Sequence, residues 1–110
     1  MLSPFAKQVH KLLRTVPRGR VTTYKELAYA MDTKAFRAIG QVMRSNPDAP
    51  NTPCHRVVSA NGTLGGFQGE KSGPKVLKKI RLLKKEGTLV HGNRVVDFHR
   101  KLYKFQNSNR

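Results

Sequence analysis

The feature that most constrains this chain is a short stretch that holds three of its prolines. Residues 46–53 read Asn-Pro-Asp-Ala-Pro-Asn-Thr-Pro. Proline fixes φ and has no amide proton to donate, so neither a helix nor a central strand can run through this stretch. It therefore separates two regions of regular structure, and it fixes the backbone directly before the only cysteine of the chain, Cys54.

Hydrophobic residues before this stretch repeat at helical spacing. Ser3-Pro4 is typical of a helix start, and apolar residues at 5, 9, 12, 13 and 16 predict a first helix that Pro17 and Gly19 end. Thr23-Tyr24-Lys25-Glu26 has the form of a capping box and predicts a second helix through Met31.

A third helix is predicted after a tight connection at Asp32-Thr33. Its inner stripe is Phe36, Ile39, Gly40 and Met43. Its opposite face carries Arg37, Gln41 and Arg44. Two short helices with a polar outer face are typical of a helix-turn-helix, but also of an ordinary helix pair, and the pattern leaves both open.

The sequence after Pro53 predicts shorter secondary-structure elements, apart from one final helix. Residues 56–59 are expected to form a strand that enters a turn, and residues 64–69 a glycine-rich loop. A final helix from about Pro74 to Gly87 should bury Val76, Leu77, Ile80 and Leu83, and residues 89–96 should form a small hairpin. The expected fold is mainly α with short β hairpins: a winged-helix-like domain with a helix-turn-helix. We expect one domain over residues 1–110, with 88–110 as a basic C-terminal extension that is solvated and packed by Val95, Phe98, Leu102 and Phe105.

The charge of the chain indicates its partners. It has 22 Lys and Arg against 6 Asp and Glu, a formal net charge of +16. Such a charge favours a polyanion, nucleic acid first and an anionic membrane surface second. No apolar run reaches the ~20 residues of a membrane span, and no leader precedes a cleavage site, so no membrane partner is expected.

The single cysteine excludes an internal disulfide and a cysteine-rich zinc site, and neither a metal nor another cofactor is expected. Cys54 is either an inert core residue or a nucleophile. A nucleophile needs a group that removes the thiol proton, and His55 is adjacent, with Arg56 adding positive potential.

Two further features favour chemistry at this cysteine. The glycines at 62, 65, 66 and 69 permit close backbone approach to a ligand, although a flexible surface loop would have the same composition. Glu86 lies in the last turn of the final helix, where the helix dipole disfavours a carboxylate. Its neighbours at i−3 and i−4 are leucines, so it has no lysine partner there. A Cys–His–acid group follows as a hypothesis.

The motif Pro53-Cys54-His55-Arg56-Val57-Val58 resembles the active-site motif of the O6-alkylguanine-DNA alkyltransferases, also called methylated-DNA–protein-cysteine methyltransferases. Residues 21–28, 36–47 and 62–67 are similar to further segments of that family, in the family's order. The resemblance covers about residues 3–87 and implies a catalytic C-terminal-type domain alone.

The resemblance implies a role for each matching residue. Cys54 would take the alkyl group, His55 would accept the thiol proton through a water, and Glu86 would orient the imidazole. Asn46 would be the hinge before the thiol, and Tyr24 would rotate the nucleotide outward and protonate the departing guanine. The expected DNA-binding residues are Arg37, which fills the gap in the base stack, with Tyr24, Gln41, Arg44 and Thr23. The expected pocket residues are Pro53, Val57, Gly65, Phe67, Gln68 and Gly69.

The implied function is DNA repair by direct, irreversible transfer of an alkyl group from O6 of guanine to the protein's own cysteine after base flipping. The implied activity is that of a single-turnover methylated-DNA–protein-cysteine S-methyltransferase. Its partner is double-stranded DNA containing O6-alkylguanine. We expect a monomer, with cooperative binding along DNA left open, located in the cytoplasm of a prokaryote or the nucleus of a eukaryote.

Two other functions stay open. One is an alkyltransferase-like lesion sensor that binds O6-alkylguanine without repairing it, although such proteins typically lack the cysteine. The other is a plain winged-helix DNA-binding module with an inert Cys54. The sequence also departs from the family: Phe67 and Gln68 stand where tyrosine and serine are common, and Asn51-Thr52 replaces a more aliphatic segment before Pro53.

Overall fold

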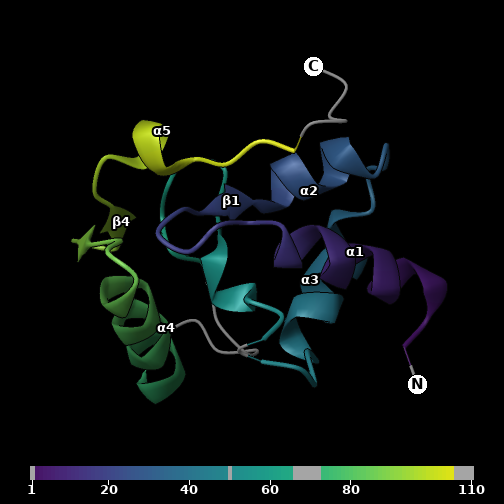
Figure 1. Ribbon diagram of the computed structural model, residues 1–110, viewed down its shortest axis with the longest axis horizontal. Coiled ribbons are helices and arrows are strands. Elements are labelled where there is room, and N and C mark those ends of the chain that lie inside the picture. The colour runs from purple at the N-terminus through teal and green to yellow at the C-terminus, as the bar shows by residue number, and fades with distance from the viewer. Residues whose placement is uncertain (1, 50, 66–72, 106–110) are drawn as a thin grey trace.

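The protein is mainly helical with short strands, as predicted from the sequence. The computed structural model describes residues 2–49, 51–65 and 73–105 (Figure 1). In chain order the elements are α1 (Pro4–Arg14), β1 (Thr22–Thr23), α2 (Tyr24–Ala30), α3 (Phe36–Arg44), the 3-10 turn η1 (Cys54–Arg56), β2 (Val57–Val58), α4 (Pro74–Lys85), β3 (Val90–His91), β4 (Arg94–Val95) and α5 (Phe98–Lys101). None of the helices in the described ranges is long and apolar enough to cross a membrane.

The helix starts follow the predicted capping residues. The Ser3 hydroxyl accepts from the amide of Ala6 at 3.1 Å at the start of α1, and the Thr23 hydroxyl accepts from the amide of Glu26 at 3.0 Å at the start of α2. These bonds satisfy amides that have no partner inside the helix. The caps therefore fix where α1 and α2 begin.

The buried faces of α3 and α4 differ most from the prediction at two positions, which are exposed, whereas Gly40 and Ile80 are half-buried. In α3, Ile39 and Met43 are buried, but Phe36 is 48% exposed, since it lies about 60° around the helix from Ile39. In α4, Leu77 is 53% exposed. It lies roughly 100° beyond Val76, off the buried line of Val76, Lys79 and Leu83.

The strand predicted at residues 56–59 is present at Val57–Val58, and it enters a turn in which the Gly62 amide donates to the Ser59 carbonyl at 2.9 Å. It pairs in parallel with β1, with Thr22 opposite Val57 and Thr23 opposite Val58. The helices between the two strands form the long crossover that a parallel pair requires. The predicted hairpin at 89–96 is confirmed: β3 and β4 are antiparallel, and the turn residues Gly92 and Asn93 have φ values of 53° and 67°.

Residues 88–105 are part of the fold and not the solvated tail that we expected. After α5 the chain runs beside β1, where the Val21 amide donates to the Lys101 carbonyl at 3.0 Å and the Tyr103 amide donates to the Val21 carbonyl at 2.7 Å. The Phe98 ring packs on Gly62, where a Cβ atom would lie 2.9 Å from the ring and φ is +88°. Of the four side chains predicted to pack this segment, Val95 and Phe105 are buried, whereas Phe98 and Leu102 are half-buried.

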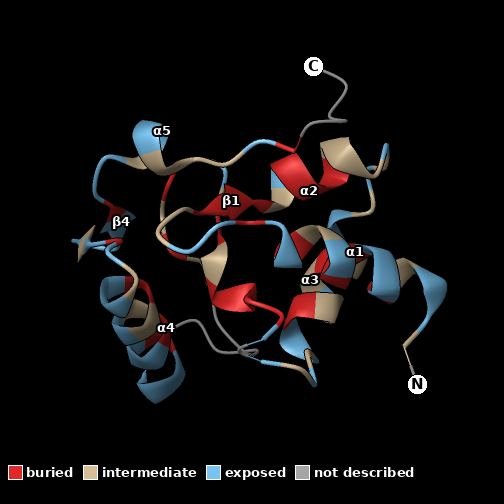
Figure 2. Cartoon of the chain, in the orientation of Figure 1, coloured by how far each residue is buried: buried red, intermediate tan, exposed pale blue. Residues whose placement is uncertain are grey.

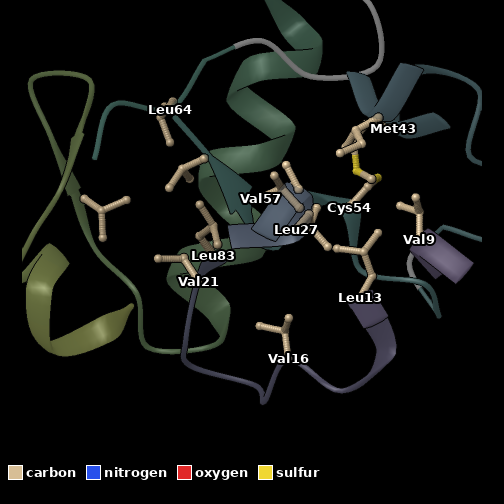
Figure 3. Packing of buried hydrophobic residues seen from close by; sticks show 14 of the residues in the cluster. Val9, Leu13, Val16, Val21, Leu27, Met43, Cys54, Val57, Leu64 and Leu83 are labelled. Atoms are coloured by element: carbon tan, nitrogen blue, oxygen red, sulfur yellow. The ribbon is translucent and has the colours of Figure 1, made fainter. Parts of the chain in front are cut away.

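One hydrophobic cluster joins the elements. The buried faces of α1, α2, α3 and α4 all turn toward it, and the outer face of α4 is exposed (Figure 2). Figure 3 shows that the cluster includes Cys54, whose side chain lies among Val9, Leu13 and Met43. Cys54 is therefore a core residue by position.

Candidate active site

Cys54 lies on a buried 3-10 turn. Pro53 precedes the turn, the Cys54 amide donates to the Thr52 carbonyl at 2.9 Å, and the Arg56 amide donates to the Pro53 carbonyl at 3.0 Å. Cys54 is 4% exposed and His55 2% exposed. Burial alone fits an inert thiol, so the neighbouring ionisable groups decide what the turn can do.

A carboxylate from α4 binds two residues of this turn. Glu86 Oε2 lies 3.1 Å from His55 Nε2 and 2.7 Å from Arg56 Nη2, and Glu86 Oε1 accepts from Arg56 Nε at 2.9 Å. Glu86 is the capping residue at the end of α4, directly before Gly87, whose φ is +91°. Its unfavourable place at a helix C-terminus is thus offset by partners outside the helix, including a bidentate guanidinium.

The charges of this group set the state of the imidazole. Burial opposes ionisation of Glu86, but hydrogen bonds from Arg56 and His55, with their charges, bring its pKa below the ordinary value. Burial lowers the pKa of His55, and the contact with Glu86 only partly opposes this. At neutral pH an ionised Glu86 can only accept, so Nε2 of a neutral His55 carries the proton and Nδ1 is left as the basic nitrogen.

Arg56 holds the site to the rest of the fold. Besides its two bonds to Glu86, its Nη1 donates to the Val16 carbonyl at 2.8 Å, just after α1. The guanidinium therefore connects α1, the cysteine turn and the end of α4. This contact set gives Arg56 a structural role at the site.

Lys79 is a residue of this site that the sequence did not reveal. It is 1% exposed, and its Nζ donates to the carbonyls of Val57 at 2.8 Å and Leu64 at 2.7 Å. Burial lowers its pKa from 10.5 to about 8, while the charge of Cys54 acts in the opposite direction. On a helix with five other Lys or Arg residues it looked like one more surface cation. The only available signal was its spacing on the line of Val76 and Leu83.

Tyr24 and Asn46 both lie close to the cysteine segment. Tyr24 is the first residue of α2, and burial raises the pKa of its phenol, with Cys54 adding to the shift, so the phenol stays protonated beside the thiol. The Asn46 amide donates to the Thr52 carbonyl at 2.8 Å and its oxygen accepts from the Asp48 amide at 2.9 Å. Asn46 thus closes the loop that leads to Cys54.

The predicted DNA-binding residues divide into two groups. Arg37, Gln41 and Arg44 are all exposed on one face of α3, as their spacing predicted. Thr23 is 3% exposed and its hydroxyl is used as the cap of α2, so the structure does not place it on that surface.

The predicted pocket is described in part. Pro53 and Val57 are buried beside Cys54, and Gly65 is half-buried with φ +67°. Phe67, Gln68 and Gly69 lie outside the described residues. Within the described ranges, no group of three His, Cys, Asp or Glu side chains could hold a metal ion.

Comparison with known proteins assigns the family. Residues 4–88 match the family model described as 6-O-methylguanine DNA methyltransferase, DNA binding domain. The chain belongs to this family.

Individual relatives extend this result. The chain is 38% identical over 100 residues to a bifunctional methyltransferase/endonuclease of Picrophilus torridus, covering 90% of this chain and 31% of the relative. It is 42% identical over 89 residues to a methylated-DNA–protein-cysteine methyltransferase of Shigella flexneri, covering 80% of this chain and 49% of the relative. The chain thus spans only 31% to 49% of the length of these relatives.

A solved structure matches the fold almost end to end. S. pombe Atl1, in complex with damaged DNA containing O6-carboxymethylguanine, superposes with a TM-score of 0.80 at 22% identity. The match covers 96% of this chain and 99% of Atl1. The fold with its C-terminal segment therefore also occurs in another protein.

Proposed function

We propose that this protein repairs DNA by moving an alkyl group from O6 of guanine to Sγ of Cys54, in a single turnover. The observation that carries the proposal is a neutral His55, the residue that follows Cys54, whose Nε2 is held by ionised Glu86. That arrangement leaves Nδ1 of His55 unprotonated and able to accept a proton, on the residue that directly follows the only cysteine. An inert core cysteine would need none of these groups.

The proposed reaction balances without a co-reactant. The thiol proton passes to His55, the sulfur forms a bond to the alkyl carbon, and the bond from that carbon to O6 breaks. The electron pair stays with guanine, which takes a proton from Tyr24. The proton gained by His55 then replaces the one that Tyr24 lost, so the products are guanine and S-alkylated Cys54.

The target base must leave the helix for this reaction. Sγ has to approach the alkyl carbon in line with the bond that breaks, and a stacked base prevents such an approach to a buried thiol. We propose that α2 and α3 act as a helix-turn-helix on duplex DNA, with Arg37 in the space that the flipped base leaves and Gln41 and Arg44 along the groove. The exposed face of α3 and the net charge of +16 support this.

A lesion sensor is the second candidate. It is favoured by the match in fold over nearly the whole length of Atl1, a protein solved with damaged DNA. A sensor would bind the lesion in the same pocket without breaking the bond to O6. The presence of Cys54 beside His55 favours repair.

One experiment separates these functions. The protein is incubated with duplex DNA bearing O6-methylguanine, and both are analysed by mass spectrometry. Repair predicts a gain of one methyl group on the sole cysteine with loss from DNA, and Cys54→Ser abolishes the transfer while lesion binding stays. Tight binding to the lesion without transfer identifies a sensor. Equal affinity for lesion and undamaged DNA would leave only a DNA-binding module.

A further inference from the structure

Thr52 is the point at which the loop before the cysteine is joined to α1. Its side chain is fully buried, at 0% exposed. The hydroxyl accepts from Arg14 Nη1 at 3.1 Å and donates to Asp48 Oδ2 at 2.9 Å. The Thr52 side chain therefore connects a base of α1 to an acid of the loop at a buried position.

The main-chain amide and carbonyl of Thr52 are also hydrogen-bonded. Its carbonyl accepts from the Asn46 side chain at 2.8 Å and from the Cys54 amide at 2.9 Å, and its amide donates to the Asp48 carbonyl at 2.9 Å. The bond to the Cys54 amide places Thr52 directly against the residue that carries the thiol. A rotation of Thr52 is thus transmitted to Cys54 through one hydrogen bond and one proline.

The helix that supplies Arg14 also packs beside the thiol. Val9 and Leu13 of α1 lie next to Cys54 in Figure 3, and Arg14 follows Leu13 in the last turn of the helix. Apolar packing fixes the distance between α1 and the cysteine segment, but it is non-directional. The bonds from Arg14 and to Asp48 define a direction for the Thr52 side chain.

We propose that the hydrogen-bonded chain Arg14–Thr52–Asp48 positions Cys54 for in-line attack, with Thr52 as the positioning residue. This inference rests on the alkyl transfer proposed above. A misplacement of about 1 Å between reacting atoms can slow a reaction by roughly a hundredfold, so a bond that orients the preceding residue affects the rate of the chemical step. It should have little effect on DNA binding, which uses α3.

Thr52→Val is the direct test, because valine keeps the shape and removes the hydroxyl. Single-turnover methyl transfer is followed over a range of concentrations of duplex DNA containing O6-methylguanine. We expect the rate constant at saturating DNA to fall about tenfold or more, with the half-saturating concentration unchanged. Thr52→Ser, which restores a hydroxyl, should recover most of the rate. The amplitude of the reaction measures the folded fraction, and the rate constant measures the chemical step. A loss of stability is thus distinguished from a loss of positioning.

Arg14→Met tests the same chain from an exposed residue, and it decides the question if Thr52→Val does not fold. It removes the guanidinium and keeps an apolar stem. Lys11→Met is the matched control, since Lys11 is exposed on the same helix and its replacement removes the same charge. We expect Arg14→Met to slow transfer severalfold and Lys11→Met to leave it unchanged.

Two results would overturn the proposal. One is a Thr52→Val protein that transfers methyl groups at the wild-type rate. The other is an Arg14→Met protein that matches Lys11→Met. A wild-type protein that transfers nothing is a different outcome, because it refutes the proposed function itself and the positioning role with it.

Discussion

The buried ammonium of Lys79 makes the stability of this protein depend on pH in an unusual range. Burial lowers the pKa of Lys79 from 10.5 to about 8 in the folded protein, whereas the unfolded chain keeps the ordinary value. Between these two values the unfolded chain binds more protons than the folded protein. The free energy of unfolding therefore rises as pH rises through this range.

The size of the effect follows from the two pKa values. Proton linkage for a group that titrates at about 8 when folded and 10.5 when unfolded gives a gain of about 2 kcal/mol between pH 7 and pH 9.5. The range ends below 10.0, the ordinary pKa of tyrosine, which Tyr24 exceeds in the folded protein. Lys79→Met should remove this gain. The variant also leaves the carbonyls of Val57 and Leu64 without their donor, but that cost is the same at every pH.

Urea denaturation at pH 7 and pH 9.5 measures the difference. The wild-type protein should gain about 2 kcal/mol, and Lys79→Met should show a flat profile. Lys78→Met is the control, because it removes one charge from the exposed side of α4 and should keep the wild-type rise. A Lys79→Met protein with the full rise would refute the assignment of this pH dependence to the buried ammonium.

Three further perturbations have defined outcomes. Glu86→Gln should lower the free energy of unfolding by about 3 kcal/mol in urea titrations, since it leaves the largely buried cation of Arg56 without its carboxylate partner. Asp97→Asn, in an exposed ion pair, should change it by about 0.5 kcal/mol or less. Arg37→Ala should slow transfer from duplex DNA. The slope of the log binding constant for non-specific DNA against log salt concentration should change by less than the ~1 unit expected for a lost phosphate contact. An unchanged transfer rate would exclude a role of Arg37 in flipping. His10 is buried with its pKa lowered, so stability should fall as pH drops below 6.5; His10→Leu should reduce this fall, and identical pH profiles for variant and wild type would contradict it.

Local signals in the sequence predicted the local structure well. Ser3 and Thr23 cap helices because a short hydroxyl side chain satisfies amides a few residues ahead, and this needs no distant partner. The parallel pairing of β1 with β2 and the addition of residues 101–103 beside β1 were not predicted. Both depend on main-chain hydrogen bonds between distant segments, and such bonds leave little trace in side-chain type.

The candidate site was predicted where it depends on unusual residues in unusual places. Glu86 was conspicuous because nothing in its own helix explained a carboxylate there, and the structure brings it to His55 and Arg56. Lys79 was missed for the opposite reason, since a lysine on a lysine-rich helix is expected in solvent. Only the position of its neighbours in space makes it a core residue.

Lys79 and Glu86 together explain why the cysteine segment is held by charged groups. They lie seven residues apart, about two turns and roughly 10 Å along α4, and they bind the two ends of the segment from His55 to Val57. Apolar side chains of similar volume would stabilise this segment at least as well. Burying ions costs free energy, and the attraction between the paired ions offsets only part of that cost. Apolar side chains would not, however, fix the tautomer of His55 or place an ammonium near Cys54. Under the proposed alkyl transfer, these charged contacts serve to hold the proton acceptor beside Cys54 in one tautomer, a role that a requirement for stability alone would not explain.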